Sequence, residues 1–392
     1  MNISSFPALI GHAGAALEAP AFFVNKQVKH LFLLADPFLV QSGQLAPLID
    51  ALDKAGLAVT LYADFAGEPK MPKMREIVAL ARDAKTEGVL GVGGGSTLDM
   101  AKILSITLVA DRPPEDYWMM ATPLPEVSLP SIMIPTTAGT GSESCSTNII
   151  SSDEGHKGWV WGPQTKPDLI ILDPELGVSL PPRMTGWCGM DALIHAFEAA
   201  SNRFGHVSAL SYAHQALRIG KEALPKVVAH GDDLEARTNM LLASSWAGAA
   251  IDQVGTSVAH HISHAMATLG PIHHGRATAI GFEITLRWLC DDSLLGDVMP
   301  EDGVRKFTAL AEIFGCANYQ DLPQALTDFM DKAAIDRSLP PHFAAFDKAD
   351  LKIQLLADYT QSMRVAAQKE VSETVIDWII EELAALPIHE TD

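Results

Sequence analysis

Short apolar runs alternate with amphipathic stretches between residues 30 and 173. The apolar runs predict strands at 30–36, 57–63, 88–93, 131–135 and 168–173. The stretches between them have helical spacing, as at 71–86. Strands joined by helices make right-handed crossovers, so this rhythm predicts a mostly parallel sheet with helices on both faces.

After residue 182 the hydrophobic spacing is helical almost to the end of the chain. The longest helical stretches lie at 186–203, 232–253, 257–268, 305–315, 350–368 and 372–386. Prolines and a glycine interrupt the pattern between Leu176 and Pro182. A chain of 392 residues suits two domains. We therefore expect an α/β domain at 1–178 and an all-helical domain at 179–392.

Composition narrows the kind of partner that the chain can bind. The net charge of -20, from 48 acidic and 28 basic residues, repels phosphate backbones and anionic lipid surfaces. We find neither a basic signal-peptide region nor an uncharged apolar stretch of about 18 residues. The four cysteines are scattered without a C-x-x-C pair, which is typical of reduced thiols. We expect a cytoplasmic protein that acts on small molecules.

Three glycines, Gly93, Gly94 and Gly95, separate the strand at 88–93 from a helix that we expect to open at Ser96. A glycine turn before a helix lets a phosphate approach backbone amides at the positive helix end. The stretch from Ser96 to Asp99 also fits a capping box, in which these side chains only satisfy helix-end amides. The residues alone leave both interpretations open.

Polar groups also follow two other predicted strands. Thr136, Thr137 and Thr140 lie in the loop after Pro135, where their hydroxyls suit a cofactor's ribose, phosphate and amide groups. Asp36 ends the first strand, where a carboxylate accepts from a ribose hydroxyl and repels a 2′-phosphate. A solvated turn and a capping aspartate are the structural alternatives. Several such loops at strand ends favour an NAD crevice.

The helical half contains two clusters of metal-ligand residues. Asp191 and His195 are one helical turn apart, and so are His260 and His264. A carboxylate with three imidazoles suits divalent iron or zinc and leaves a coordination position open. The spacing does not separate His260 from its neighbour His261, or His274 from its neighbour His273. A metal without sulfur ligands beside a dinucleotide crevice predicts a Lewis acid for hydride transfer.

Four motifs together resemble the iron-containing, or group III, alcohol dehydrogenases, and the resemblance covers nearly the whole chain. They are GGGSTLDMAK at 93–102, PTTAGTGSE at 135–143, GMDALIHAFE at 189–198 and the histidine pattern from His260 to His274. The resemblance implies a Rossmann-like N-terminal domain and an all-α C-terminal domain, as in dehydroquinate synthase. It also implies an active site in the cleft between them and a dimer or larger homo-oligomer.

The resemblance assigns roles to individual residues. The ligands of a ferrous ion, sometimes replaced by zinc, would be Asp191, His195, His260 and His274. His264 would serve proton relay or substrate binding. The residues on the NAD side would be Asp36, Gly94, Gly95, Ser96, Asp99, Thr136, Thr137, Thr140 and Lys157. The implied reaction is NAD-dependent interconversion of a primary alcohol and an aldehyde.

The departures from the family pattern concern the substrate. Ser144 and Cys145 predict a polar pocket wall, and Trp187 and Cys188 replace smaller residues before the ligand motif. Arg276 could pair with an anionic aldehyde or hydroxy acid, although a surface ion pair is the more common role. Three alternatives remain: a maleylacetate-reductase-like enzyme, a lyase of the dehydroquinate-synthase type, and a metal-stapled scaffold.

Overall fold

The computed structural model describes residues 5–65, 67–357 and 360–389 and forms two compact units. The α/β unit comprises Ser4–Leu180 and Asp232–Gly248, and the helical unit comprises Pro181–Gly231 and Ala249–Asp392. The short segment Asp232–Gly248 comes from the helical half of the sequence, yet it packs within the α/β unit.

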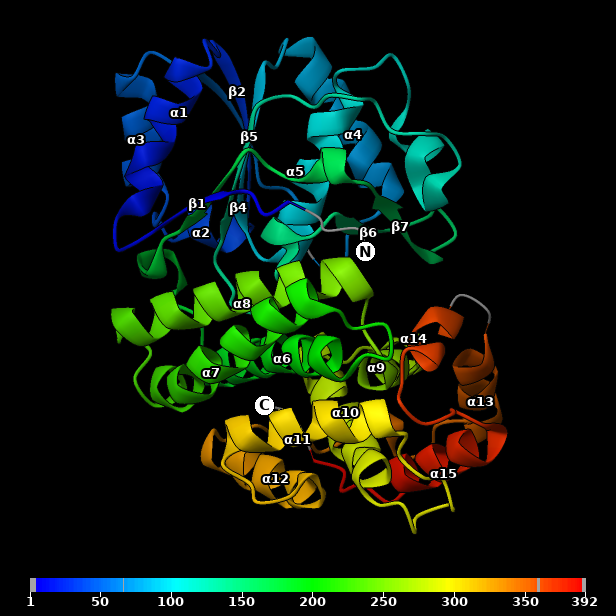
Figure 1. The fold of residues 1–392 in the computed structure, drawn as a ribbon. Coiled ribbons are helices and arrows are strands. Elements are labelled where there is room, and N and C mark those ends of the chain that lie inside the picture. The colour runs from blue at the N-terminus through cyan, green and yellow to red at the C-terminus, as the bar shows by residue number, and fades with distance from the viewer. Residues whose placement is uncertain (1–4, 66, 358–359, 390–392) are drawn as a thin grey trace. The chain divides into compact units, whose positions relative to one another are not determined.

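A six-stranded, fully parallel sheet forms the centre of the α/β unit, in the order β1-β8-β5-β4-β2-β3 (Figure 1). Its strands are β1 Ala8–Gly11, β2 His30–Ala35, β3 Ala58–Tyr62, β4 Gly88–Gly93, β5 Ser131–Pro135 and β8 Leu169–Leu172. The five strands predicted from apolar runs are confirmed, and so is the α/β plus all-α fold class. β1 was not predicted: this edge strand reads ALIG, and unlike β8 it has no fully buried residue.

Helices cover both faces of this sheet, as β2 illustrates. Leu31 and Leu33 point into one core with α1 (Ala19–Asn25) and α3 (Ala46–Lys54). Phe32 and Leu34 point into the other core with α4 (Met71–Asp83) and α5 (Gly95–Thr107). Figure 1 shows these two pairs on opposite sides of the strands. Alternation with a period of two residues therefore fills two hydrophobic layers.

Shorter elements complete the α/β unit. β6 (Thr147–Ser151) and β7 (Lys157–Trp161) form an antiparallel pair that the sequence analysis did not predict. The remaining short helices are α2 Pro37–Gln41, η1 Ala15–Glu18, η2 Pro114–Met120, η3 Ser142–Ser144, η4 Pro163–Thr165 and η5 Pro174–Gly177. The loop before β5 thus contains the 3-10 helix η2.

The rest of the chain is helical, as predicted. The helices are α6 Pro182–Ser201, α7 Val207–Ala229, α8 Leu234–Val254, α9 Val258–Leu269, α10 His274–Cys290, α11 Glu301–Phe314, η6 Tyr319–Asp321, α12 Leu322–Lys332, η7 Pro341–Phe343, α13 Lys348–Leu356, α14 Gln361–Val365 and α15 Glu373–Ala384. The stretch predicted at 350–368 is divided between α13 and α14. No helix in the described ranges is both long and apolar enough to cross a membrane.

Candidate metal centre and cofactor loops

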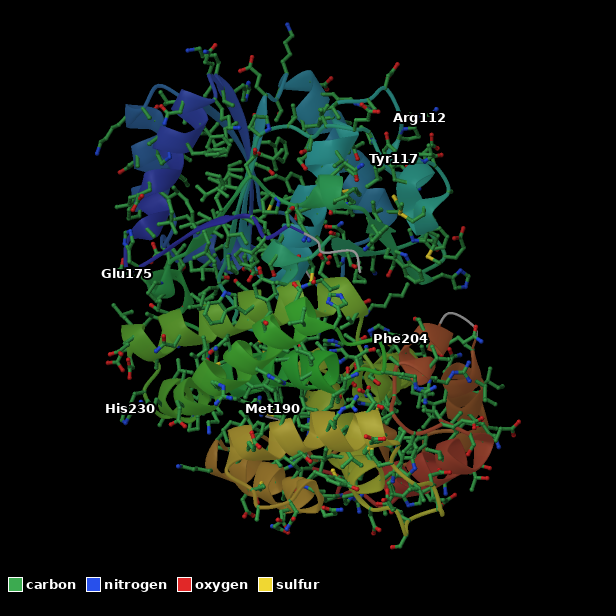
Figure 2. The ribbon with its side chains drawn as sticks, viewed as in Figure 1. Arg112, Tyr117, Glu175, Met190, Phe204 and His230 are labelled. Carbon is green, nitrogen blue, oxygen red and sulfur yellow. The ribbon has the colours of Figure 1, made fainter. Side chains whose placement is uncertain are left out.

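Two carboxylates and one imidazole lie on the same face of helix α6, inside the helical unit. Asp191, His195 and Glu198 follow the spacing i, i+4 and i+7, which places them one above another. All three are buried. Figure 2 labels Met190, the residue before Asp191, near the middle of this helix. A stripe of charge inside a helical core requires partners, because a buried unpaired charge is costly.

Helices α9 and α10 supply the facing imidazoles. His260 lies in the first turn of α9, and His274 is the first residue of α10. A Cβ added to Gly275 would lie 2.2 Å from the carbonyl oxygen of Trp187 on α6. The glycine after His274 therefore lets α10 approach the backbone of α6 closely enough to bring His274 beside Asp191.

The side chains converge on the carboxylate of Asp191. Its Oδ1 atom lies 3.5 Å from His260 Nε2 and 3.7 Å from His274 Nε2, and its Oδ2 lies 3.9 Å from His195 Nδ1. One ligand atom from each of Asp191, His195 and His260 lies within 4.8 Å of the others. Asp191 Oδ1 and His260 Nε2 are buried without a hydrogen-bond partner among the described residues. When His260 is neutral with its proton on Nδ1, these two atoms are facing acceptors and fit a cation placed between them.

Electrostatics in the metal-free cluster agree with this geometry. Burial favours a neutral Asp191, but the imidazoles of His195, His274 and His260 outweigh burial and lower the pKa of its carboxyl. Burial likewise opposes a charged His260, but Glu198 and Asp191 raise its pKa to about 9. The cluster therefore attracts positive charge.

The neighbouring histidines have other contacts. His261 is buried and its Nε2 lies 2.8 Å from the carbonyl oxygen of Leu355, and burial lowers its pKa to about 4. His273 stacks on Trp187 with ring centroids 5.0 Å apart. His264 lies one turn beyond His260, with its ring centroid 5.8 Å from that of His274. The structure thus brings together the four side chains predicted as ligands and places His264 at their edge.

In the α/β unit, the predicted cofactor residues follow the carboxyl ends of three adjacent strands, β2, β4 and β5, except for Lys157, which begins β7. The backbone N–H of Asp36 donates to Val92, and that of Thr136 donates to Gly93. The side chain of Asp36 accepts from the N–H of Phe38 at 2.9 Å and so caps α2. The capping alternative for Asp36 is therefore confirmed, and its contact with a ribose hydroxyl stays a prediction.

The two predicted cofactor loops lie against each other. A Cβ on Gly95 would lie 2.8 Å from the methyl carbon of Thr140, and one on Gly94 would lie 3.4 Å from the hydroxyl of Thr137. The expected helix start at Ser96 is wrong, because α5 begins at Gly95 with Gly94 as its N-cap and no side-chain cap. The capping-box alternative is therefore wrong as well.

Asp99 and Lys157 are already engaged. Asp99 Oδ1 accepts from the hydroxyl of Ser142 at 2.5 Å, and Oδ2 accepts from the N–H of Ile149 at 2.9 Å. The ammonium of Lys157 donates to Glu68 at 2.8 Å. Asp99 thus holds the second loop, whereas the Lys157 pair is partly exposed and could exchange for another acceptor.

The sequence analysis missed several buried polar residues. Lys102 is fully buried and donates to the carbonyl oxygens of Ser142 and Cys145. The buried carboxylate of Glu143 accepts from the hydroxyl of Ser245 at 2.5 Å. Both lie in motifs that were attributed to cofactor binding. Their burial depends on loop carbonyls and on α8, which residue spacing does not reveal.

Three residues that bear on the substrate are buried. Ser144 and Cys145 donate to carbonyl oxygens of α8, and the polar pocket wall that they were expected to form stays a prediction. Arg276 is not at the surface: it is 2% exposed, pairs with Asp336 at 2.9 Å and donates to Ser338 at 2.7 Å. The ion-pair interpretation of Arg276 is therefore confirmed, and the surface position is wrong.

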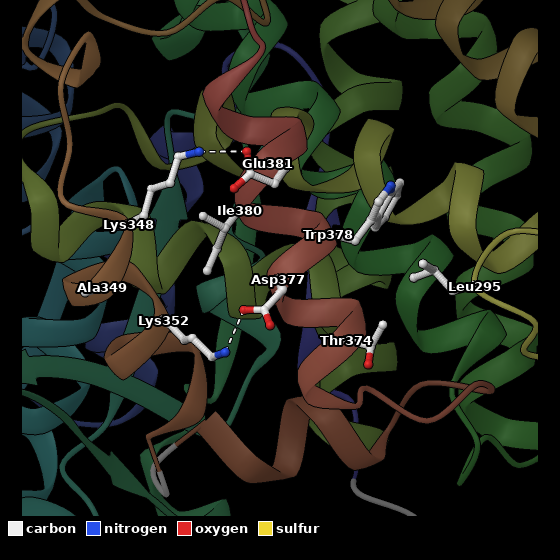
Figure 3. A pocket seen from close by; sticks show the side chains of 9 residues that line it. All are labelled: Leu295, Lys348, Ala349, Lys352, Thr374, Asp377, Trp378, Ile380 and Glu381. Carbon is white, nitrogen blue, oxygen red and sulfur yellow. Dashed lines mark hydrogen bonds and ion pairs between the residues drawn. The ribbon is translucent and has the colours of Figure 1, made fainter.

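A surface pocket of about 480 Å³ lies elsewhere in the helical unit, between α13, α15 and Leu295 (Figure 3). The ammonium of Lys348 lies 2.7 Å from Glu381, and that of Lys352 lies 2.6 Å from Asp377. None of the predicted ligands lines this pocket. The charged groups drawn around it are paired, so the pocket adds nothing to the metal centre.

Comparisons with known proteins decide the family. Residues 7–174 match the family described as iron-containing alcohol dehydrogenase, and residues 185–378 match the family's C-terminal region. The chain belongs to the iron-containing alcohol dehydrogenase family. The choline dehydrogenase of Bacillus subtilis is 30% identical over 84% of this chain and 80% of that protein. The predicted family is thus confirmed.

The sequence match to another member of this family spans a smaller share of each protein. The probable alcohol dehydrogenase EutG of Salmonella typhimurium is 39% identical over 64% of each chain. A solved structure of sulfoacetaldehyde reductase from Bifidobacterium kashiwanohense, in complex with NAD+, has a TM-score of 0.88. That protein is 25% identical, and the match covers 98% of both chains. The relatives thus share one fold and family but differ in their named substrates.

Proposed function

We propose that the chain transfers a hydride between NAD(H), held by the α/β unit, and a primary alcohol or aldehyde whose oxygen meets a metal held by the helical unit. The buried pair of Asp191 Oδ1 and His260 Nε2 carries this proposal. These atoms lie 3.5 Å apart, and neither has a hydrogen-bond partner among the described residues. A metal cation satisfies both atoms when His260 is neutral, whereas in the metal-free chain the two side chains form an ion pair at 3.5 Å without a hydrogen bond.

The donor set fits divalent iron, and it fits zinc as well. Asp191 offers carboxylate oxygen, and His195, His260 and His274 offer imidazole nitrogen, a borderline combination without thiolate. The free thiol of Cys188 has its pKa raised to about 12 by burial and by Asp191, so it stays protonated and is a poor ligand. We assign the four residues as ligands and iron as the resident metal of this family member.

The protein residues have distinct tasks around the reacting carbon. When bound, the metal supplies Lewis acidity toward the substrate oxygen, and NAD(H) accepts or donates the hydride. Asp191, His195 and His260 are buried, so water competes weakly with them for the charge, and the partly exposed His274 completes the set. The imidazole of His264, one helical turn from His260, accepts the hydroxyl proton during oxidation and returns it during reduction.

The α/β unit supplies the proposed nucleotide site. Gly94 and Gly95 leave backbone space at the start of α5, where free N–H groups and the helix dipole favour a pyrophosphate. Ser96, Thr136, Thr137 and Thr140 offer hydroxyls beside this turn. Asp36 accepts a ribose hydroxyl and selects NAD over NADP. The NAD+ complex of the sulfoacetaldehyde reductase supports this assignment.

A neutral alcohol or aldehyde is the favoured substrate, and an anionic one is the second candidate. The anionic candidate rests on the similarity to sulfoacetaldehyde reductases. Within this chain, however, the guanidinium of Arg276 is occupied by Asp336 and Ser338. The complete ligand cluster disfavours a maleylacetate-reductase-like enzyme and a scaffold. Assays over short alcohols, diols, aldehydes and anionic hydroxy acids separate these candidates.

We further propose a cytoplasmic homodimer or larger homo-oligomer. Free thiols at all four cysteines are consistent with a reducing compartment. The oligomer rests on the family resemblance alone, and light scattering of the purified chain tests it.

The test compares adjacent histidines after anaerobic reconstitution with ferrous iron. His274→Ala is expected to lose bound metal and to lower NAD(H) turnover by about 10³-fold, because one ligand of the Lewis acid is missing. His273→Ala, which removes a ring stacked on Trp187, is the matched control and should keep both. Elemental analysis and fluorescence titration with NADH measure metal content and nucleotide affinity separately.

NADH affinity should stay unchanged in both variants, because the glycine and threonine loops belong to the other unit. Full activity of His274→Ala without metal would sink the proposed function. Equal metal loss in His273→Ala would instead show that the first turn of α10, and not the imidazole of His274, is what matters.

A further inference from the structure

Glu198 is a buried carboxylate that the proposed reaction does not use directly. It is 4% exposed and lies two helical turns after Asp191 on α6. Its oxygens receive three hydrogen bonds, each 2.7 Å long, from the N–H groups of Ser257 and Ala259 and from Nδ1 of His260. We propose, in an inference that rests on the proposed function, that Glu198 is a positioning residue. It fixes both the tautomer and the position of the His260 imidazole.

The tautomer follows from the acceptor character of a carboxylate. An ionised Glu198 can only accept, so His260 must carry a proton on Nδ1 to bond with it. The remaining nitrogen, Nε2, then offers a lone pair when His260 is neutral. That nitrogen is the one 3.5 Å from Asp191 Oδ1 and without a hydrogen-bond partner in the described structure. Glu198 therefore directs the correct nitrogen of His260 toward the metal.

The place of His260 follows from the two backbone bonds. Ser257 is the N-cap of α9, and its own side chain makes no capping hydrogen bond. The N–H groups of Ser257 and Ala259 both donate to Glu198 instead. A negative charge here also complements the positive end of the helix dipole. One carboxylate thus anchors the first turn of α9 and the imidazole that this turn presents.

A glutamine could not replace these contacts, because both carboxylate oxygens face N–H donors. Oε2 accepts from Ser257 and His260, and Oε1 accepts from Ala259. In one amide orientation, the NH2 group faces the N–H of Ala259, so two donors oppose each other and this hydrogen bond is lost. In the other, it meets the N–H of Ser257 and donates to His260 Nδ1, which moves the imidazole proton to Nε2 and blocks the ligand lone pair.

His274 provides the contrast within the same cluster. Its Nδ1 lies 3.1 Å from the hydroxyl of Ser263. A hydroxyl donates as readily as it accepts, so it tolerates either tautomer of the imidazole. The side chain of His274 is also 38% exposed, whereas that of His260 is 2% exposed. Control by an outer partner should therefore be strong at His260 and weak at His274.

The experiment measures zinc affinity of the metal-free full chain by competition with a chromogenic chelator. Glu198→Gln is expected to weaken zinc binding by about 10- to 100-fold, the usual effect of losing an outer partner of a ligand histidine. Ser263→Ala is the matched control and should weaken it by less than about 10-fold. The visible absorption of cobalt-loaded protein should change in Glu198→Gln and stay unchanged in Ser263→Ala.

Thermal unfolding of the metal-free variants shows whether each one folds. Should Glu198→Gln not fold, Glu198→Asp carries the test, because its shorter side chain cannot reach all three donors. Its zinc affinity should then fall about 10-fold. Wild-type affinity in a folded Glu198→Gln or Glu198→Asp variant overturns the inference. Failure of the wild-type chain to bind metal or turn over NAD(H) would instead overturn the proposed function.

Discussion

Asp99 on α5 and Asp191 on α6 are both buried helical aspartates, and their surroundings differ. Both oxygens of Asp99 accept hydrogen bonds from Ser142 and Ile149, and Lys102 lies 3.6 Å away. Asp191 faces imidazoles, and its Oδ1 has no hydrogen-bond partner in the described ranges. Burial raises the pKa of Asp99 despite its partners, whereas the pKa of Asp191 is lowered despite burial.

The difference separates a structural carboxylate from a functional one. Internal donors satisfy Asp99, so its burial is explained by the loop that it organises. Asp191 Oδ1 lacks a hydrogen-bond donor among the described residues, and the groups that face the Asp191 carboxylate at 3.5–3.9 Å are the imidazoles of His195, His260 and His274. A carboxylate surrounded by imidazoles in this way can hold a cation. Burial alone therefore does not identify a site. The number of unsatisfied ligand atoms that face one another does.

Removing the cation beside Asp99 should have the largest effect on stability. In Lys102→Met, Asp99 loses its counter-charge, and the carbonyl oxygens of Ser142 and Cys145 lose a donor. Breaking a buried pair in this way typically costs about 3–5 kcal/mol, which we expect as a loss in the free energy of unfolding. Urea unfolding measures this loss. Zinc affinity should not change, because the metal cluster belongs to the other unit.

Wild-type stability of Lys102→Met would contradict the structural role of the Asp99 pair. A loss of zinc affinity without a loss of stability would reverse the comparison and give Asp99 a part in the metal centre. Lys332→Met, at the exposed C-terminal end of α12, is the matched control for removing one lysine charge.

Crowding the helix contact beside Asp191 should have a smaller effect. In Gly275→Ala, the new methyl group would lie 2.2 Å from the carbonyl oxygen of Trp187, so α10 must shift away from α6 and carry His274 with it. Overpacking of this kind costs about 1–3 kcal/mol. We expect that loss in urea unfolding, together with weaker zinc binding in chelator competition.

Gly303→Ala is the control for this substitution. Its added methyl would lie 2.5 Å from the sulfur of Met299 and 3.1 Å from Oε1 of Gln368, and both atoms belong to flexible side chains that can move aside. Gly303→Ala should therefore keep wild-type zinc affinity. Unaltered zinc affinity in Gly275→Ala would mean that the position of His274 does not depend on the close contact between α10 and α6.

The comparison also shows what the sequence could predict. Apolar runs predicted β2, β3, β4, β5 and β8, because buried parallel strands need continuous hydrophobic residues. Helical spacing brought Asp191 and His195 onto one face. Glu198 also lies on that face, seven residues after Asp191, so the same spacing could have identified it. Its role required the N–H groups of α9, which lie about sixty residues later.

Other contacts between residues far apart in the sequence could not be predicted either, because residue spacing does not encode them. Lys102 follows a helical pattern like any solvated lysine, and its buried ammonium is stabilised by Asp99 and by carbonyl groups of the 142–147 loop. The antiparallel strands β6 and β7 read TNIIS and KGWVW, so polar residues and a glycine interrupt the apolar runs that revealed the parallel strands. The packing of Asp232–Gly248 within the α/β unit depends on tertiary partners that periodicity does not encode.

A third carboxylate, Asp36, lies between these two cases, and its substitution should have the smallest effect of the three. It is partly exposed, and one of its oxygens accepts a hydrogen bond from the N–H of Phe38, so it combines a structural cap with a proposed ribose contact.

Asp36→Ser keeps a good helix cap and removes only the negative charge. We expect the ratio of kcat/KM for NADPH over NADH to rise about 5-fold, since one screened charge contributes about 1 kcal/mol. Asp53→Ser removes the same charge from the exposed face of α3 and should leave this ratio unchanged. Equal ratios in both variants would confine Asp36 to capping α2 and would place it with Asp99 among the structural carboxylates.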